Sequence, residues 1–141
     1  MQSALSGRLT DGGFDRSKPA FVSWLGVTQY LTTEALEATL EVIGGFARGT
    51  ELVIQYLVPA EMRDDGGQAL TDFFMPRAAA LSEPWLTFYS PIGIRELLAA
   101  RGLVVVDDVG HKDQIDISLW DRSDGLRPHE LGRLAHAAVA R

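Results

Sequence analysis

The acidic stretch at residues 107–116 carries side chains that could bind a metal ion. It contains four aspartates and one histidine: Asp107, Asp108, His111, Asp113 and Asp116. Carboxylate oxygens are the ligands that hard divalent cations prefer. The spacing is irregular, however, and His129 and His136 are distant in sequence. A motif without structural context is weak. We therefore favour a solvated turn and predict no metal site. A small metal-binding protein is a third alternative, after the two functions given at the end of this section.

The sequence contains no pattern typical of covalent or phosphate chemistry. There is no Gly-x-Ser-x-Gly elbow and no Walker loop. The chain has no cysteine, which excludes cysteine nucleophiles, thiolate zinc sites, iron–sulfur clusters and disulfide scaffolds. No pairing of residues indicates a catalytic dyad, so the catalytic residues are unknown at this level.

Composition indicates one globular α/β domain. The 141 residues are 46% hydrophobic and 23% charged, and the net charge is −6. An acidic chain with scattered basic residues is a poor partner for nucleic acid. No apolar run approaches the roughly 20 residues that cross a bilayer. The first 15 residues are polar and lack the apolar stretch of a signal peptide. We expect a cytoplasmic protein that binds neither nucleic acid nor membrane.

The first half of the chain predicts a strand, a helix and a second strand. Residues 1–19 form an entry segment, with one weak helical turn near residues 4–9, and residues 20–141 form the domain. Residues 20–25 are apolar on both faces, as in a buried strand. The next helix begins at Thr32 or Thr33, which can cap it, and ends at Gly49. Residues 51–58 then form a strand, which completes a βαβ unit.

The second half predicts helices first and strands later. A helix over residues 68–81 contains Pro76, which predicts a kink or a break. Ser90 and Pro91 begin another helix, and Gly102 ends it. Residues 103–106 form a third strand, and the alternation of Ile115, Ile117 and Leu119 suggests an edge strand. Periodicity leaves the stretch from residue 131 to residue 139 open between helix and strand.

Three stretches together resemble a known family. Residues 19–32 read Pro-Ala-Phe-Val-Ser-Trp-Leu-Gly-Val-Thr-Gln-Tyr-Leu-Thr. Residues 82–85 read Ser-Glu-Pro-Trp, with Phe88 and Pro91 beyond, and residues 124–127 read Asp-Gly-Leu-Arg. Their order and spacing resemble the C-terminal half of the S-adenosylmethionine-dependent methyltransferases of the leucine carboxyl methyltransferase-like family, in its bacterial, actinobacterial branch. The resemblance extends from about Phe14 to the end of the chain.

The resemblance implies the C-terminal half of a class I Rossmann-like sheet. Residues 21–24 would be the fourth strand of the complete fold and residues 51–58 the fifth. Residues 103–106 would be one of the last two strands. The C-terminal stretch would be their antiparallel partner, which favours a strand at residues 134–139. The strand at residues 21–24 would leave an edge exposed, and an open apolar edge promotes association. We therefore expect a homodimer or a complementing N-terminal chain.

The resemblance also implies a site at the carboxyl end of the first strand, where open α/β sheets bind ligands. S-adenosylmethionine would be the cofactor, lined by Trp24, Leu25 and Gly26. The acceptor-binding residues would be Tyr30, Tyr56, Phe74, Arg77, Trp85 and Tyr89, in a region that also contains Phe73 and Phe88. Core packing or a surface position is the alternative for each of them. Many relatives have Glu-Gly where this chain has Leu25-Gly26, so a carboxylate is absent here.

The sequence departs from a complete member of the family. Gly7, Gly12 and Gly13 follow no strand, so they do not form the glycine-rich turn that holds the cofactor. We expect a methyltransferase-family protein that lacks the N-terminal cofactor-binding half. Its reaction would be O-methyl transfer to a small-molecule or carboxylate acceptor, and the reactive carbon would come from the cofactor. The alternative is a truncated, non-catalytic α/β domain that acts as a dimeric binding or interaction module.

Overall fold

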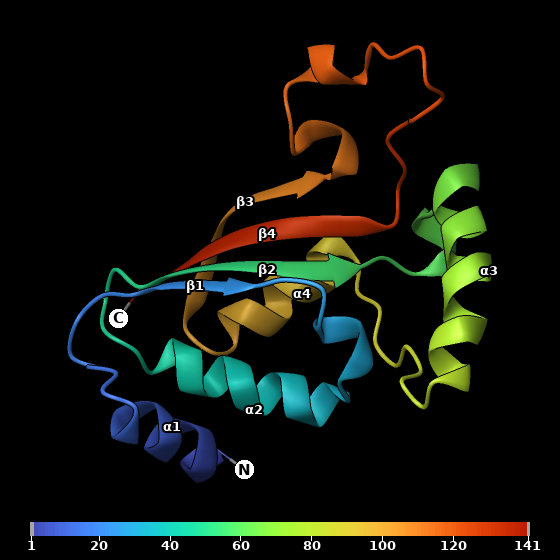
Figure 1. Ribbon diagram of the computed structural model, residues 1–141. Helices are drawn as coiled ribbons and strands as arrows, with labels where there is room; N and C mark the ends of the chain where they lie inside the picture. Colours follow the sequence, from blue (N-terminus) through green and yellow to red (C-terminus); the bar gives the residue numbers. More distant parts are fainter. Residues whose placement is uncertain (1, 141) are drawn as a thin grey trace.

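A four-stranded sheet forms the centre of the computed structural model, which describes residues 2–140 (Figure 1). The strands are β1 (Phe21–Trp24), β2 (Glu51–Leu57), β3 (Leu103–Gly110) and β4 (Gly132–Val139), in the spatial order β1-β2-β4-β3. β1 is parallel to β2, and β4 is antiparallel to both of its neighbours. The carboxyl ends of β1, β2 and β3 therefore meet at one edge of the sheet. The expected α/β class and the antiparallel closing strand are confirmed.

Helix α2 (Thr33–Gly44) connects β1 to β2 and covers one face of the sheet. The hydroxyl of Thr32 accepts a hydrogen bond from the backbone N–H of Ala35 at 3.2 Å, which caps the helix as predicted. The apolar face of α2 is fully buried over the sheet. The predicted end at Gly49 is wrong. The helix stops five residues earlier, and Gly49, with φ of +87°, lies in the turn that enters β2.

Helices α4 (Pro91–Ala99) and α1 (Gln2–Asp11) lie on the same side of the sheet as α2 (Figure 1). Ser90 caps α4 by accepting the backbone N–H of Gly93 at 3.0 Å, and Pro91 occupies the first turn, as predicted. α1 packs against α2 and is longer than the single turn expected. Within residues 2–140, no helix covers the opposite face.

Helix α3 (Asp65–Ala80) lies beyond the carboxyl end of β2 (Figure 1). Asp64 caps it, because its Oδ1 accepts the backbone N–H of Gly67 at 2.7 Å. The helix starts three residues before the predicted position. It continues through Pro76, so the predicted break into two pieces is not observed. A single proline removes one bond of the helical ladder, and the remaining bonds keep the helix continuous.

The long connection between β3 and β4 differs most from the prediction. β3 continues past residue 106 to Gly110, with an irregularity in register between Val105 and Asp107. The predicted edge strand over residues 115–119 is wrong, since this stretch holds the 3-10 helix Ile117–Trp120. Asp116 accepts hydrogen bonds from the backbone N–H and hydroxyl of Ser118, and such local bonds compete with strand pairing.

The core lies between the sheet and the helical layer. Side chains from α2, α4 and one face of the strands are fully buried there, among them Leu36, Leu40, Leu52, Ile54, Ile94, Leu98, Leu103, Ala135 and Ala137. β1 had been expected to be buried on both faces, yet Phe21 is 64% exposed. This side chain points to the face that has no helix. No helix in the described part of the chain is long and apolar enough to span a bilayer.

Candidate functional site

The turn after β1 is fixed to the end of β2. Gly26 has φ of +70°, a conformation that favours glycine. Its backbone N–H donates to Oε1 of Gln55 at 2.8 Å, and the hydroxyl of Thr28 donates to the backbone carbonyl of Gln55 at 2.8 Å. Leu25, between the strand and the glycine, is half exposed. The turn therefore presents Leu25 and Gly26 at the carboxyl edge in a defined position.

A strap formed by residues 85–89 crosses the segment that follows this turn. The backbone N–H of Leu86 donates to the carbonyl of Gln29 at 2.6 Å. The hydroxyl of Thr87 donates to the carbonyl of Thr28 at 2.8 Å and is buried. The backbone N–H of Tyr89 donates to the carbonyl of Leu57 at 2.9 Å. The strap thus joins the ends of β1 and β2 into one structural unit.

Several of the predicted site residues come together in this unit. Trp24 is half-buried at the end of β1, and Tyr30 is 37% exposed in the 3-10 turn Thr28–Tyr30. The strap contributes Trp85 and Tyr89, and the Tyr89 hydroxyl lies 3.5 Å from the hydroxyl of Thr33. These residues belong to segments that lie at the carboxyl ends of β1 and β2, and the side chain of Trp24 lines a hollow with α1 and α2 on the helical side.

The indole N–H of Trp85 is buried and has no hydrogen-bond acceptor among the described residues. The Trp85 ring lies 6.5 Å from that of Phe88, and the guanidinium of Arg63 stacks over Phe88 at 5.0 Å. The Nε of Arg63 also donates to the carbonyl of Val58 at 3.1 Å. A buried donor without a partner is costly, so a polar ligand atom that accepted from Trp85 would be stabilised there.

The two predicted residues on α3 form a separate exposed cluster. Phe74 packs edge-to-face against Phe73, with ring centroids 5.0 Å apart. Arg77 lies over the Phe73 ring at 3.6 Å and donates to the Phe73 carbonyl. Arg77 is therefore engaged within its own helix in this structure, and its guanidinium sits on the surface of α3.

Tyr56 lies in the core rather than at an open surface. Its side chain is fully buried, and its hydroxyl donates to Oδ2 of Asp108 at 2.7 Å. The Nε of Arg133 donates to the other carboxylate oxygen of Asp108 at 2.8 Å. Burial, and then the bond to Asp108, raise the pKa of Tyr56 well above its usual range. The three side chains lock β2, β3 and β4 together near the carboxyl edge.

The hydrogen-bonded group of Tyr56, Asp108 and Arg133 was not predicted from the sequence. Asp108 had been assigned to a solvated turn, because the predicted strand ended at residue 106. The pair Asp107-Asp108 after an apolar run carries no pattern that identifies a buried carboxylate. Gln55 was missed as well, since a single glutamine in a strand gives no signal in sequence.

Two histidines that are distant in sequence meet in the connection between β3 and β4. The rings of His111 and His129 lie 4.1 Å apart, and the backbone N–H of His129 donates to Nδ1 of His111 at 3.2 Å. Burial, and then the nearby His111, lower the pKa of His129. Residues 2–140 contain no group of three or more histidine, aspartate or glutamate side chains placed to hold a metal ion.

The Leu25-Gly26 turn is compatible with a ligand at the carboxyl edge of the sheet. Open α/β sheets bind ligands at the carboxyl ends of their strands, where Leu25, Gly26 and the strap lie. The N–H of Gly26 is already bonded to Gln55, so a ligand would contact this turn by van der Waals packing. Gly7 lies within α1, and Gly12 and Gly13 lie at its end. None of the three lies in a strand-to-helix turn, so the described residues hold no glycine-rich cradle.

The order of the strands is that of part of a class I methyltransferase fold. A crystal structure of a DUF574 family protein from Streptomyces avermitilis matches with a TM-score of 0.67 and 18% identity, over 96% of this chain and 50% of that protein. The "putative methyltransferase from Thermobifida fusca YX" matches with a TM-score of 0.62 and 18% identity, over 99% of this chain and 52% of that protein.

Sequence comparisons point to the same family. The family model for leucine carboxyl methyltransferase matches residues 1–44. The "Putative S-adenosyl-L-methionine-dependent methyltransferase YktD" of Bacillus subtilis (strain 168) is 27% identical over 130 residues, which are 92% of this chain and 42% of that protein. These matches confirm the resemblance to the leucine carboxyl methyltransferase-like family. The chain spans about half the length of the relatives it matches.

Proposed function

We propose that this chain forms the acceptor side, and one wall of the S-adenosylmethionine cleft, of a methyltransferase. The observation that carries the proposal is the unit formed by the Gly26 turn and the strap at residues 85–89. This unit closes over the carboxyl ends of β1 and β2 in a sheet with the class I order. The similarity to YktD over most of the chain supports the choice of reaction and cofactor.

In this proposal the cofactor supplies the methyl group, and the chain positions the acceptor. Trp24, Leu25 and Gly26 form the wall against the cofactor. The aromatic side chains of Tyr30, Trp85 and Tyr89 pack against the acceptor and exclude water. Alignment of two reactants in a dry site is a large part of the catalysis of group transfer.

The next part of the proposal concerns the molecule that accepts the methyl group and the residues that bind it. We propose O-methyl transfer to a small-molecule or carboxylate acceptor. Arg77 is the guanidinium that could pair with a carboxylate in bidentate fashion after leaving Phe73, and Phe74 lies beside it. For Tyr56 we propose a positioning role through Asp108, since its hydroxyl is already bonded.

The cofactor's glycine-rich cradle would come from residues outside this sequence, in the same chain or in another. A homodimer is the second possibility for the assembly, and the exposed Phe21 and the edge of β1 favour association of some kind. We also propose that the protein is located in the cytoplasm. Cell fractionation tests this location.

Calorimetric titration with S-adenosylhomocysteine tests this function. The chain is joined through a flexible linker to the N-terminal half of YktD, and Leu25→Arg is compared with Ile92→Arg. Ile92 is 70% exposed on α4, away from the site. We expect binding by the wild type and the Ile92 variant, and at least tenfold weaker binding after Leu25→Arg. Equal affinity for S-adenosylhomocysteine in the wild type and both variants would show that Leu25 does not contact the cofactor. Absence of binding heat in all three proteins would favour a non-catalytic interaction module.

A further inference from the structure

His111 and His129 join three segments of the chain beside the start of α3. His111 begins the 3-10 turn His111–Asp113 that follows β3, and His129 lies where the connection returns beside α3 (Figure 1). The ring of Trp120 packs edge-to-face with that of His111, with centroids 4.9 Å apart. His129 packs on α3, since a Cβ added at Gly66 would lie 3.3 Å from the Cβ of His129. We call these two residues the histidine pair.

The hydrogen bond within the histidine pair requires a neutral His111. The backbone N–H of His129 can only donate, so Nδ1 of His111 supplies the lone pair that accepts it at 3.2 Å. In a protonated imidazole both ring nitrogens carry a proton. Protonation of His111 therefore turns the acceptor into a second donor and breaks the bond.

His129 lies where a positive charge is unfavourable. Its Nδ1 is buried and has no hydrogen-bond partner among the described residues. A proton on this nitrogen would be a buried donor without an acceptor, which is costly. Burial, and then the nearby His111, lower the pKa of His129. Because the two rings lie 4.1 Å apart, they would also repel each other if both were charged.

The surrounding carboxylates compensate this charge only in part. Within residues 2–140, the ion pairs include neither ring of the histidine pair. Asp64 and Glu130 favour the charged form of His129, but burial and His111 outweigh them. Oδ1 of Asp64 already accepts the backbone N–H groups of Gly67 and Glu130. The other charged side chains on the surrounding elements are Asp65, Lys112, Asp113, Asp116, Asp121 and Arg133.

The contact between the connection and α3 lies directly beside the histidine pair. The backbone N–H of Glu130 donates to Oδ1 of Asp64 at 3.0 Å, and a Cβ at Gly67 would lie 2.1 Å from the carbonyl oxygen of Glu130. Further along the connection, the indole N–H of Trp120 donates to the carbonyl of Lys112, and the ion pair of Arg122 with Asp124 is likewise local. Residues 129–130 therefore hold this connection on α3.

We propose that the histidine pair is a pH-sensitive contact, which holds the β3–β4 connection on α3 at neutral pH and releases it on mild acidification. Protonation of His111 breaks the bond to His129, and protonation of His129 adds a buried donor and repulsion. Histidine is the side chain that ordinarily changes its charge between about pH 5 and 8. This proposal does not depend on the proposed function.

The direction of the pH dependence follows from the pKa of His129. Since the folded protein lowers this pKa, folding favours the neutral ring. The contact is therefore most stable above the usual pKa of histidine. It loses stability as the pH falls below that value and on toward the lowered pKa of His129.

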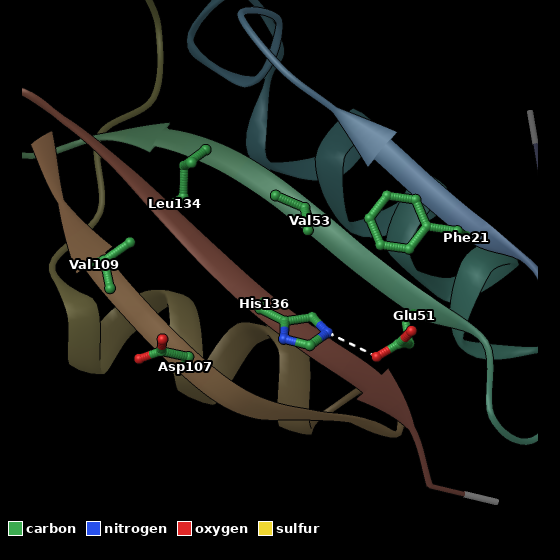
Figure 2. A pocket seen from close by; sticks show the side chains of 7 residues that line it. All are labelled: Phe21, Glu51, Val53, Asp107, Val109, Leu134 and His136. Atoms are coloured by element: carbon green, nitrogen blue, oxygen red, sulfur yellow. Dashed lines mark hydrogen bonds and ion pairs between the residues drawn. The ribbon is translucent and has the colours of Figure 1, made fainter. Parts of the chain in front are cut away.

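The third histidine of the chain provides an internal control. His136 lies in β4 on the sheet face without helices, and its Nε2 is 3.0 Å from Oε1 of Glu51 (Figure 2). A proton on His136 gains an attraction to this carboxylate. Acidification should therefore weaken the contact at the histidine pair without weakening the contact of His136.

Hydrogen exchange by NMR at two pH values tests the proposal. Protection factors are compared, because the intrinsic exchange rate itself depends on pH. Between about pH 7.5 and about pH 5.5, the protection of the His129 and Glu130 amides should fall at least about tenfold. The amides of Leu52 and Ile54 in β2 should keep their protection. The fall should follow the titration of the His111 or His129 ring, which the ring resonances report in the same samples.

Two non-titrating substitutions should remove this pH dependence. His111→Asn retains an uncharged acceptor close to the position of Nδ1, and His129→Phe retains a packed ring without a charge. The protein with both substitutions should keep the protection of residues 129 and 130 at both pH values. His136→Gln is the matched control, and its protection should fall as in the wild type.

Four results would overturn the proposal. The first is unchanged protection of His129 and Glu130 in the wild type, and the second is an equal fall in the protein with both substitutions. The third is an equal loss of protection in β2, which indicates general acid unfolding. The fourth is a fall that follows the titration of His136 or disappears in His136→Gln. This result needs only the wild type and the control, so the test remains decisive if the double substitution prevents folding.

Discussion

Gln55 and Gly26 are joined by a hydrogen bond of 2.8 Å between the side-chain Oε1 and the backbone N–H. Gln55 lies in β2 and Gly26 lies in the turn that follows the parallel strand β1, 29 positions earlier in sequence. The bond takes the first N–H beyond Leu25 and directs it toward β2. The carboxyl edge of the sheet is thereby ordered before any ligand arrives, which reduces the cost of binding there.

Replacement of Gln55 tests this ordering. Gln55→Ala removes the acceptor, and we expect a loss of about 1 kcal/mol in the free energy of unfolding. The amide resonance of Gly26 should shift and exchange faster. Gln55→Glu keeps an acceptor oxygen at the same position, so it should retain most of the amide protection. Denaturant unfolding and hydrogen exchange by NMR give both quantities, and an unchanged Gly26 amide in Gln55→Ala would contradict the assigned bond.

Gly26 itself should resist substitution. With φ of +70°, Gly26→Ala should destabilise the fold by about 1–2 kcal/mol, because a side chain disfavours this conformation. Gly7→Ala is the matched control, since a Cβ there meets no atom within 4 Å and Gly7 lies in the middle of α1. It should stabilise by up to about 1 kcal/mol through helix propensity. Thermal unfolding should show a lower stability than the wild type for Gly26→Ala and a higher stability for Gly7→Ala. Two changes in the same direction would refute the prediction.

Close packing of α3 on the chain before β4 predicts a strong effect at Gly67. A Cβ added there would lie 2.1 Å from the carbonyl oxygen of Glu130, so backbone must move. We expect Gly67→Ala to cost about 1–3 kcal/mol. Gly66→Ala is the control, since its nearest contact is the His129 side chain at 3.3 Å. Denaturant unfolding should give a much lower free energy of unfolding for Gly67→Ala than for Gly66→Ala. The reverse order would contradict the described packing.

Tyr56 should not ionise in the folded protein at pH values where an exposed tyrosine does. The chain has three tyrosines, and burial raises the pKa of Tyr56. Absorbance at the tyrosinate band should therefore report fewer groups than three until the protein unfolds. Because the folded pKa lies above the unfolded one, this group stabilises the fold below the unfolded pKa. The stabilisation is lost as the pH rises toward the folded pKa.

The variant Tyr56→Phe checks the source of this behaviour. The variant should leave the tyrosinate titration curve unchanged below the pH at which the protein unfolds. It should lower the free energy of unfolding at neutral pH by about 2 kcal/mol, because the removed hydrogen bond is made to a carboxylate. A loss of amplitude in Tyr56→Phe would show that its hydroxyl is accessible.

β1, β2 and the start of β3 could be predicted from the sequence, and the reasons are local. The apolar runs at residues 20–25 and 51–58 have the composition of buried strands, and Thr32 and Ser90 signal the helix starts. The C-terminal stretch was ambiguous because alanine supports either structure. Its assignment to a strand came only from the resemblance, and its pairing partners, β2 and β3, are distant in sequence.

The site was less accessible to sequence reasoning, because its contacts join distant segments. The strap at residues 85–89 was recognised as aromatic, but its backbone bonds to Gln29 and Leu57 have no sequence signature. Asp108 was placed in a turn because charged residues usually end a strand. In the structure Arg133 and Tyr56 satisfy its carboxylate, so the strand continues past it.

The position of β4 has a consequence for the order in which the molecule can assemble. β4 is the last strand in sequence but lies between β2 and β3, which do not pair with each other. Until β4 has been synthesised, β3 has no partner among the described strands, and β1 and β2 are the two of these strands that can pair. Removal of β4 would therefore separate the described strands into a two-stranded ribbon and a lone strand, and the core between β2 and β3 forms only after β4 has been synthesised.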